Sequence, residues 1–318
     1  MPKVYVTRML PRPVMEELGR VCEYAVNEAD RRVSRAELLS GVKGCDGVIS
    51  TLNDAIDAEV MRAAGPQCRI VANYAVGYNN IDLAEARRLG IAVTNTPGVL
   101  TDATADLAWA LLFAAARCVS EGDRLVRHGS FNWAPEFMLG ADITGRTLGV
   151  IGAGRIGLNF ARKARGFDMK VIYAGRHRSS EFEAETGGTF VTKEELLRTA
   201  DFISLHVTLT PETRHLIGEL ELGMMKPTAI LINASRGPVV DEKALVRALR
   251  ERRILAAGLD VYENEPEVEP GLKELDNVVL TPHVGTATVG TRTEMGFMVV
   301  RNVAAALAGQ EPPNLVRA

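Results

Sequence analysis

The chain has 318 residues, 47% of them hydrophobic and 24% charged, so it can bury a large core and is long enough for two domains. Its formal net charge of −3 offers no basic surface to a nucleic acid, and its most apolar run, residues 103–116, is too short to span a bilayer. We therefore expect neither nucleic acid nor membrane as a partner. Residues 1–8 lack a signal-like apolar stretch, which favours the cytoplasm.

The first hundred residues alternate β-branched runs with helical patterns, which is typical of a parallel α/β sheet. Helical spacing then continues from residue 102 to residue 129 and predicts one long helix. The expected strands of this first part are residues 4–7, 47–50, 70–73 and 92–94, and its expected helices include residues 14–18 and 83–89.

A second and more regular series of strand patterns begins at residue 147 and predicts a complete dinucleotide-binding fold. The last helical pattern, 291–307, has no sheet of its own, so we expect it to return to the first domain. The prediction is α/β, two Rossmann-like domains with parallel sheets: a discontinuous substrate-binding domain, 1–98 plus 288–318, with an NAD(P)-binding domain, 99–287, inserted in it. Hinges are expected near 97–102 and 285–290. The six expected strands of the second domain are 148–151, 170–173, 202–206, 229–233, 256–260 and 278–281.

A G-x-G-x-x-G motif, in which Arg155 and Ile156 separate the last two glycines, follows the first strand of this second series and opens a helix. Gly152 permits the tight turn, Gly154 lets the backbone approach a pyrophosphate, and Gly157 allows the helix to pack on the strand. The alternative is a turn that needs its glycines for packing alone. The context favours a dinucleotide site.

The second strand of the motif ends without the acidic residue that usually holds the ribose 2′-hydroxyl of NAD. Gly175, Arg176 and Arg178 stand there instead, and guanidinium groups match a phosphate in geometry and charge. We therefore expect NADP(H) to be preferred, with NAD(H) possible. The alternative is that both arginines are solvated loop cations.

Arg236, Glu265 and His283 each follow a predicted strand of the second domain, where the ligands of such sheets bind. An arginine can hold a carboxylate bidentately, a histidine can donate a proton to a carbonyl oxygen, and a carboxylate can favour the protonated imidazole. Each residue also has a structural interpretation: an ion pair, a solvated acid or a core histidine. The four cysteines, Cys22, Cys45, Cys68 and Cys118, form no metal-ligand pattern, and we expect no metal site.

Six segments carry a resemblance to the D-2-hydroxyacid dehydrogenase family, in particular to its glyoxylate/hydroxypyruvate reductase branch. The resemblance implies Glu265, at the E-P position, rather than Glu263 or Glu267 as the partner of His283. His206 is the weaker catalytic alternative to His283, since no E-P partner follows it. The segments are 76–82 (VGYNNID), 95–101 (NTPGVLT), 233–237 (NASRG), 258–261 (GLDV), 263–266 (ENEP) and 280–283 (LTPH).

Further contacts are implied by the same resemblance. Backbone N–H groups of Val76 and Gly77 would hold the substrate carboxylate, and Leu52 and Trp133 are candidate walls of the pocket. Trp133 would also lie at the contact of a homodimer, although an ordinary core position is an alternative. Besides the glycine motif and the arginines, the expected cofactor contacts are Thr104, His206, Val207, Thr213, Ala234, Asp260 and His283.

The expected activity is NADPH-dependent reduction of a small 2-keto acid, glyoxylate or hydroxypyruvate, to the 2-hydroxy acid. Arg236 would hold the carboxylate and polarise the carbonyl, and the His283–Glu265 pair would supply the proton. Another D-2-hydroxy acid remains an alternative substrate. A dinucleotide-sensing regulator similar to a transcriptional co-repressor of the same fold is the alternative from another functional class.

Overall fold

The computed structural model describes residues 1–29, 31–129 and 131–317. The chain splits into two compact units, Met1–Leu100 with Thr286–Ala318, and Thr101–Gly285. The first segment ends at residue 100 where the sequence predicted 98, and the second begins at residue 286 where the sequence predicted 288. The first unit is therefore discontinuous, and the second is formed by one continuous stretch of chain.

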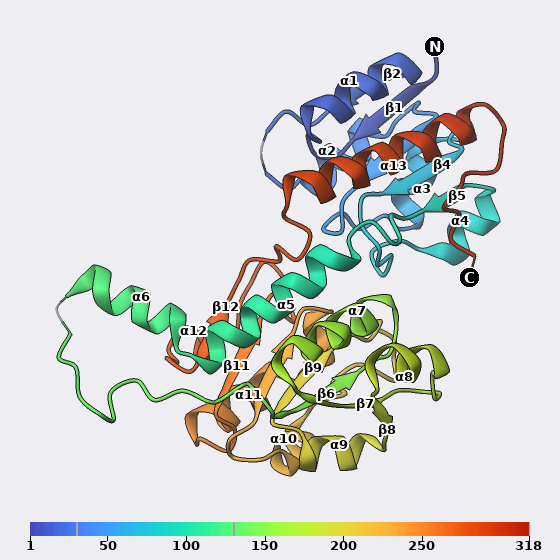
Figure 1. The fold of residues 1–318 in the computed structure, drawn as a ribbon. Helices are drawn as coiled ribbons and strands as arrows, with labels where there is room; N and C mark the ends of the chain where they lie inside the picture. Colours follow the sequence, from blue (N-terminus) through green and yellow to red (C-terminus); the bar gives the residue numbers. More distant parts are fainter. Residues whose placement is uncertain (30, 130, 318) are drawn as a thin grey trace. The chain divides into compact units, whose positions relative to one another are not determined.

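The first unit is built on a five-stranded parallel sheet in the order β2-β1-β3-β4-β5 (Figure 1). Helix α13 packs against α1 and β4 and buries Val299 and Val303 there, so the last helix does return to this unit. The strands are β1 Lys3–Val6, β2 Glu23–Val26, β3 Gly47–Ser50, β4 Ile70–Asn73 and β5 Ala92–Thr94, and the helices are α1 Arg12–Val21, α2 Arg35–Gly41, α3 Ala58–Ala64, α4 Leu83–Leu89 and α13 Val289–Leu307.

The second unit has a seven-stranded parallel sheet in the order β12-β11-β10-β9-β6-β7-β8. Its strands are β6 Thr147–Ile151, β7 Lys170–Ala174, β8 Thr189–Phe190, β9 Phe202–Leu205, β10 Ile230–Asn233, β11 Ala256–Leu259 and β12 Val278–Leu280. Its helices are α5 Thr101–Ala116, α6 Val119–His128, α7 Arg155–Lys163, α8 Ser180–Thr186, α9 Lys193–Thr199, α10 Glu219–Met224, α11 Glu242–Arg250 and α12 Pro270–Lys273, with short 3-10 turns at Ala164–Phe167 and Gly237–Val239.

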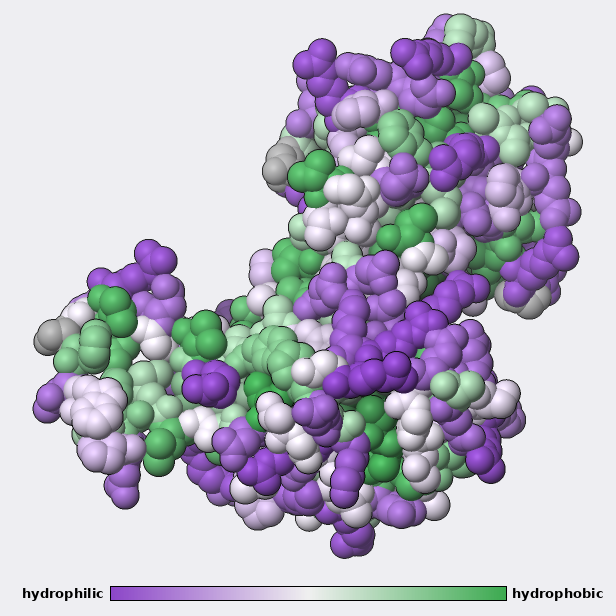
Figure 2. All heavy atoms as spheres, viewed as in Figure 1, coloured by the Kyte–Doolittle hydropathy of each residue, from purple (hydrophilic) through white to green (hydrophobic). Residues whose placement is uncertain are grey.

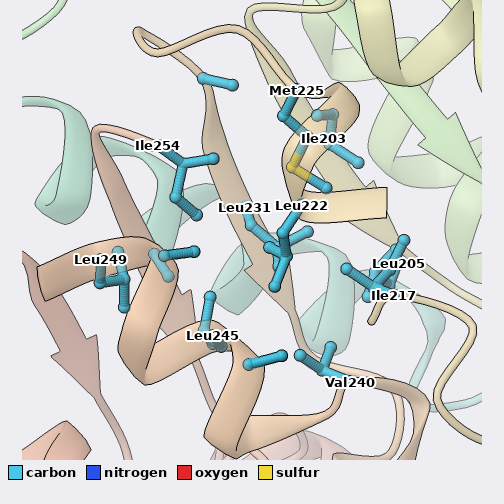
Figure 3. Close-up of a cluster of buried hydrophobic side chains, with 14 of the residues drawn as sticks. Ile203, Leu205, Ile217, Leu222, Met225, Leu231, Val240, Leu245, Leu249 and Ile254 are labelled. Atoms are coloured by element: carbon cyan, nitrogen blue, oxygen red, sulfur yellow. The ribbon is translucent and has the colours of Figure 1, made fainter. Parts of the chain in front are cut away.

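Helix α11 covers one face of this sheet because its apolar residues recur on one side of the helix. Leu245 and Leu249 point toward Leu231 of β10 and its neighbours in a fully buried cluster (Figure 3). The start of α11 is held by Asp241, whose carboxylate accepts a hydrogen bond from the backbone N–H of Ala244. This packing fixes both ends of the 234–241 connection, which carries Arg236.

The single long helix expected over residues 102–129 is wrong, since the chain forms two helices, α5 and α6, bent by 63°. The break lies at Cys118, whose φ of 52° is left-handed. The carbonyl oxygen of Ala116 accepts a hydrogen bond from the N–H of Ala141, so the returning chain caps α5. Among the described residues no single helix is long and apolar enough to cross a membrane, and only the bent α5–α6 pair has that length and composition.

Helix α5 is a buried core helix, whereas α6 buries no residue of its own. In Figure 1, α6 and the chain that follows it project from the remainder of the second unit, and Figure 2 shows apolar side chains on this projection. We call residues 119–139 the arm. Its exposed large apolar side chains are Val119, Val126, Phe131, Trp133, Phe137 and Leu139.

Candidate active site

The glycine motif follows β6 in a turn that larger residues could not form. Gly152 has a φ of 104°, and a Cβ placed on it would lie 2.6 Å from the carbonyl oxygen of His206. A Cβ on Gly157 would lie 2.1 Å from the carbonyl oxygen of Gly152. Both glycines are therefore required by the local packing of α7 against β6 and β9.

Gly154 differs from these two glycines because nothing lies within 4 Å of the position its Cβ would take. It is exposed and occupies the N-cap of α7, a helix of nine residues, and Arg155 and Ile156 follow it. The first N–H groups of a helix have no acceptor within that helix and attract anions. An open backbone at such an end fits the pyrophosphate of a dinucleotide.

The two arginines after β7 are in different surroundings. Nε and Nη2 of Arg178 donate to the two carboxylate oxygens of Glu183, at 2.7 and 2.8 Å, and this pair already uses one edge of the guanidinium. Arg176, exposed beside Gly175, forms no ion pair within the described part of the chain. Of the pair expected to recognise a 2′-phosphate, Arg176 is thus the one available to do so.

His206 follows β9 and packs its ring against Phe160, with centroids 4.9 Å apart. Its Nε2 lies 2.9 Å from the hydroxyl of Ser204, and burial lowers the pKa of His206 to about 3. The imidazole is therefore neutral near pH 7 and is not a proton donor.

Two further expected cofactor contacts lie after His206. Val207 lies beside Gly152. Thr213 closes the next turn, because its hydroxyl accepts from the N–H of Thr210 and donates to the carbonyl of Thr208.

Glu265 and His283 form a hydrogen-bonded pair, with Glu265 Oε2 lying 2.7 Å from His283 Nδ1. The other oxygen of Glu265 accepts from the N–H of Tyr262 at 3.0 Å. Burial opposes ionisation of Glu265, but the bond to His283, its charge, the Tyr262 N–H and the charge of Arg236 outweigh burial and lower the pKa of Glu265. A carboxylate held ionised in this way engages Nδ1 of the imidazole, and Nε2 makes no hydrogen bond among the described residues.

Arg236 is the residue after Ser235 in the connection from β10 to α11, and its Nη1 donates to the carbonyl of Ser235 at 2.7 Å. Burial of the guanidinium lowers the pKa of Arg236, and the charge of Glu265 partly offsets this. The guanidinium remains positively charged because the pKa of arginine starts above 12. It places a cation on the same side of the sheet as the Glu265–His283 pair.

Asp260 directly follows β11 and is almost completely buried. Its carboxylate accepts from the hydroxyl of Thr281 and from the N–H groups of Val284 and Gly285, at 2.7, 2.8 and 2.8 Å. Burial raises the pKa of Asp260 despite these donors and the charge of His283. Buried Thr104 of α5 lies against Gly285, and Ala234 directly follows the adjacent β10, so the three expected cofactor contacts gather at one edge of the sheet.

Sequence reasoning missed the side chains that hold the loop of Glu265. Buried Glu242, at the start of α11, accepts from the N–H of Glu263 at 2.7 Å, and burial raises its pKa. Glu263 in turn accepts from Arg214 and lies 2.6 Å from Nε2 of His215. Glu263 is thus engaged elsewhere, which explains why it is not the partner of His283. An acid at a helix start gives no sequence signal for such a role.

The remaining expected substrate residues belong to different units of the chain. In the first unit, Leu52 follows β3, and Val76 and Gly77 follow β4, all half-buried at the carboxyl end of the parallel strands. In the second unit, Trp133 lies on the arm with 75% of its surface exposed, so the alternative of an ordinary core position is wrong for the chain by itself. Within the described residues no group of three or more His, Cys, Asp or Glu could hold a metal ion.

A family model and a sequence relative both place the chain among the 2-hydroxyacid dehydrogenases. Residues 109–285 match the model of the D-isomer specific 2-hydroxyacid dehydrogenase, NAD binding domain. The chain is 50% identical over 320 residues to a glyoxylate reductase of Thermococcus onnurineus (strain NA1), covering 99% of this chain and 96% of that protein.

Solved structures show the same similarity. The TT0316 protein from Thermus thermophilus is 46% identical, with a TM-score of 0.93 and coverage of 99% of this chain and 100% of that chain. A NADPH-dependent glyoxylate/hydroxypyruvate reductase from Sinorhizobium meliloti, in complex with NADP and malonate, is 34% identical, with a TM-score of 0.84 and coverage of 99% and 96%.

Proposed function

Because the chain belongs to the D-isomer specific 2-hydroxyacid dehydrogenase family and is therefore a nicotinamide-dependent oxidoreductase, we propose that it reduces glyoxylate, and hydroxypyruvate as a second substrate. The observation that carries the chemistry is the 2.7 Å pair of Glu265 and His283 beside the cation of Arg236. A general acid, a carboxylate that orients it and a carboxylate-binding arginine are the groups that this reduction requires.

Arg236 binds the carboxylate of the keto acid and polarises its carbonyl. When bound, the dihydronicotinamide supplies hydride to the carbonyl carbon. His283 donates a proton from Nε2 to the carbonyl oxygen, since its Nδ1 is engaged by Glu265. Glu265 holds the ring through Nδ1, and the lowered pKa of Glu265 favours its ionised form.

Within the cofactor site, the open N-cap at Gly154 would hold the pyrophosphate, and Asp260 with Thr104 would border the nicotinamide. Preference for NADPH is part of the proposal. It is supported by the absence of an acid at the end of β7 and by exposed Arg176. The family relative from Sinorhizobium meliloti, crystallised with NADP, supports it independently.

A homodimer is also proposed, with the arm as the contact surface. The arm carries six large apolar side chains that its own unit leaves exposed. Several exposed apolar side chains on one segment are typical of an interaction site. Trp133 is the most exposed of the six and would serve as an aromatic anchor.

The experiment that tests the activity is oxidation of NADPH by the purified protein, followed by loss of absorbance with glyoxylate, hydroxypyruvate and pyruvate in turn. NADH is run in parallel at equal concentration. Rapid oxidation with glyoxylate, lost in His283→Ala, is the expected result. Binding of dinucleotide without turnover of any keto acid would contradict the proposal and favour the regulatory alternative.

A further inference from the structure

Three successive backbone carbonyls in the loop after β4 are each held by a hydrogen bond from inside the first unit. The carbonyl of Ala75 accepts from the N–H of Thr96 at 3.0 Å. The carbonyl of Val76 accepts from Nδ2 of Asn95, and that of Gly77 from Nδ2 of Asn73, both at 2.8 Å. These hydrogen bonds anchor every backbone carbonyl of residues 75–77.

Anchoring a carbonyl also aims the N–H of the next residue, because a trans peptide is planar and its C=O and N–H point in opposite directions. The cis bond after Glu265 is the only one in the described chain, so these three peptides are trans. The N–H groups of Val76, Gly77 and Tyr78 are therefore directed away from Thr96, Asn95 and Asn73. None of the three donates a hydrogen bond within the described residues.

Asn73 is itself held in a buried polar network. It lies at the end of β4, fully buried, and its Oδ1 accepts from the hydroxyl of Ser50 at 3.1 Å. Asn80, also within 3.4 Å of Asn73, donates to the carbonyls of Thr51 and Asp54. Because the side chain of Asn73 is held by several hydrogen bonds, it also restricts the rotation of the peptide whose carbonyl it binds.

The carboxylate of Asp54 completes this network around Leu52. It accepts from the N–H and hydroxyl of Thr51 at 2.7 and 2.9 Å, and from the hydroxyl of Thr7. The loop after β3 and the loop after β4 are thus fixed on the same polar core. Side chains that bond backbone groups in this way restrict loop motion before any ligand arrives.

We propose that Asn95 and Asn73 are positioning residues that aim the N–H groups of Gly77 and Tyr78 as ready-made donors for the carboxylate of the keto acid. The inference rests on the proposed function, since it names how this loop would hold that substrate. Neither asparagine touches the substrate. Their effect is to prevent the two peptides from rotating, so that binding does not have to order them.

The test is Asn95→Asp, which keeps the size of the side chain, removes its N–H donor and places an oxygen opposite the Val76 carbonyl. The expected result is a rise of about tenfold in KM for glyoxylate, the loss typical of a weakened hydrogen bond to a charged group. The thermal midpoint and the Kd for NADPH, whose proposed contacts lie in the second unit, should stay near the wild-type values.

The matched control is Asn277→Asp. Asn277 is also half-buried and also donates through Nδ2 to backbone carbonyls, those of Leu249 and Leu255 at 3.2 and 3.0 Å. It precedes β12, at the sheet edge opposite His283, so KM for glyoxylate should not change. If Asn95→Asp did not fold, Asn95→Ser would be measured in the same way.

An unchanged KM in a folded Asn95 variant would overturn the inference, and so would an equal rise in the Asn277 control. Failure of the proposed function would be recognised by a different result, because the wild-type protein would then oxidise NADPH with none of the keto acids. Asn73→Asp is expected to raise KM further but also to lower the thermal midpoint, because its side chain is fully buried.

Discussion

Nδ1 of His283 lies 2.7 Å from Oε2 of Glu265, and residue 283 adopts a left-handed backbone with a φ of 55°. The side chains of His283 and Glu265 are 23% and 21% exposed, so the pair is only partly buried. A non-glycine residue at positive φ is uncommon and is found at functional positions. The backbone conformation and the hydrogen bond together determine where the proton would be delivered.

Replacing His283 with alanine should lower kcat for glyoxylate by a factor of about 100 or more, because a positioned acid contributes at least that much. His215→Ala is the matched control, since His215 also pairs with a carboxylate, Glu263, but at an exposed site. The control should retain kcat within a fewfold. Equal losses in both variants, measured by steady-state kinetics, would refute the assignment.

Cofactor preference should depend on Arg176 more than on Arg178. Arg176→Ala should lower the ratio of kcat/KM for NADPH to that for NADH by about tenfold, since it removes a cation available to the 2′-phosphate. Arg178→Ala is the control, because its guanidinium is already bound by Glu183. A larger change with Arg178→Ala would mean that Glu183 releases it to the cofactor.

Substitution of Gly157 and substitution of Gly154 should have different effects, the first on stability and the second on cofactor binding. Gly157→Ala would place a Cβ 2.1 Å from a carbonyl oxygen and should cost about 3 kcal/mol of unfolding free energy. Gly154→Ala meets no atom of the protein and should cost less than about 1 kcal/mol, while raising the Kd for NADPH. Denaturant unfolding and a dinucleotide titration separate the two effects, and equal destabilisation would contradict the interpretation.

Stability toward acid should include a contribution from His206. Its folded-state pKa is about 3, below the ordinary value of about 6.5, so the unfolded chain binds one more proton between these pH values. This residue should therefore lower the unfolding free energy by at most about 1.4 kcal/mol per pH unit as the pH falls from about 6.5 toward 3.

His206→Asn should flatten this acid dependence, and His128→Asn, at the exposed end of α6, should not. Both variants are compared by denaturant unfolding at several pH values between about 7 and 4. A His206→Asn slope equal to that of the wild-type protein would show that the ring is protonated in the folded state.

The arm predicts a measurable change in assembly. Trp133→Ser together with Leu139→Ser should shift the mass found by light scattering from dimer to monomer, because both side chains are exposed and apolar. Leu220→Ser is the control, since Leu220 is 74% exposed but lies on α10, outside the arm. A wild-type monomer, or a double variant that remains dimeric, would contradict the proposed contact.

The sequence predicted the structure best where a strand pattern stood directly beside a recognisable motif. The strands next to the glycine motif and next to Arg236 and His283 combine β-branched runs with turns, and they lie where they were predicted. Strands β2 and β8 were missed because edge strands carry a weaker apolar pattern: Glu23 and Tyr24 are exposed, and β8 has two residues.

Other features leave no local signal. Nothing at Cys118 marks the end of α5, because the break depends on Ala141 returning from a distant part of the sequence. Asn73, Asn95 and Glu242 are likewise polar residues without periodicity, and their roles follow from backbone groups brought close by the fold. Glu265 and Glu263 differ only in their three-dimensional partners, so the family motif was needed to choose between them.

The strand order of the second unit separates the proposed catalytic residues from the residue proposed to select the cofactor. The proposed catalytic residues follow β10, β11 and β12, whereas Arg176 follows β7, and three strand spacings, β7–β6, β6–β9 and β9–β10, lie between them. At about 4.8 Å per spacing this is roughly 14 Å, beyond the range over which substitutions usually interact. Changes that exchange one nicotinamide cofactor for the other should therefore combine additively with changes to substrate turnover, and each can be optimised alone.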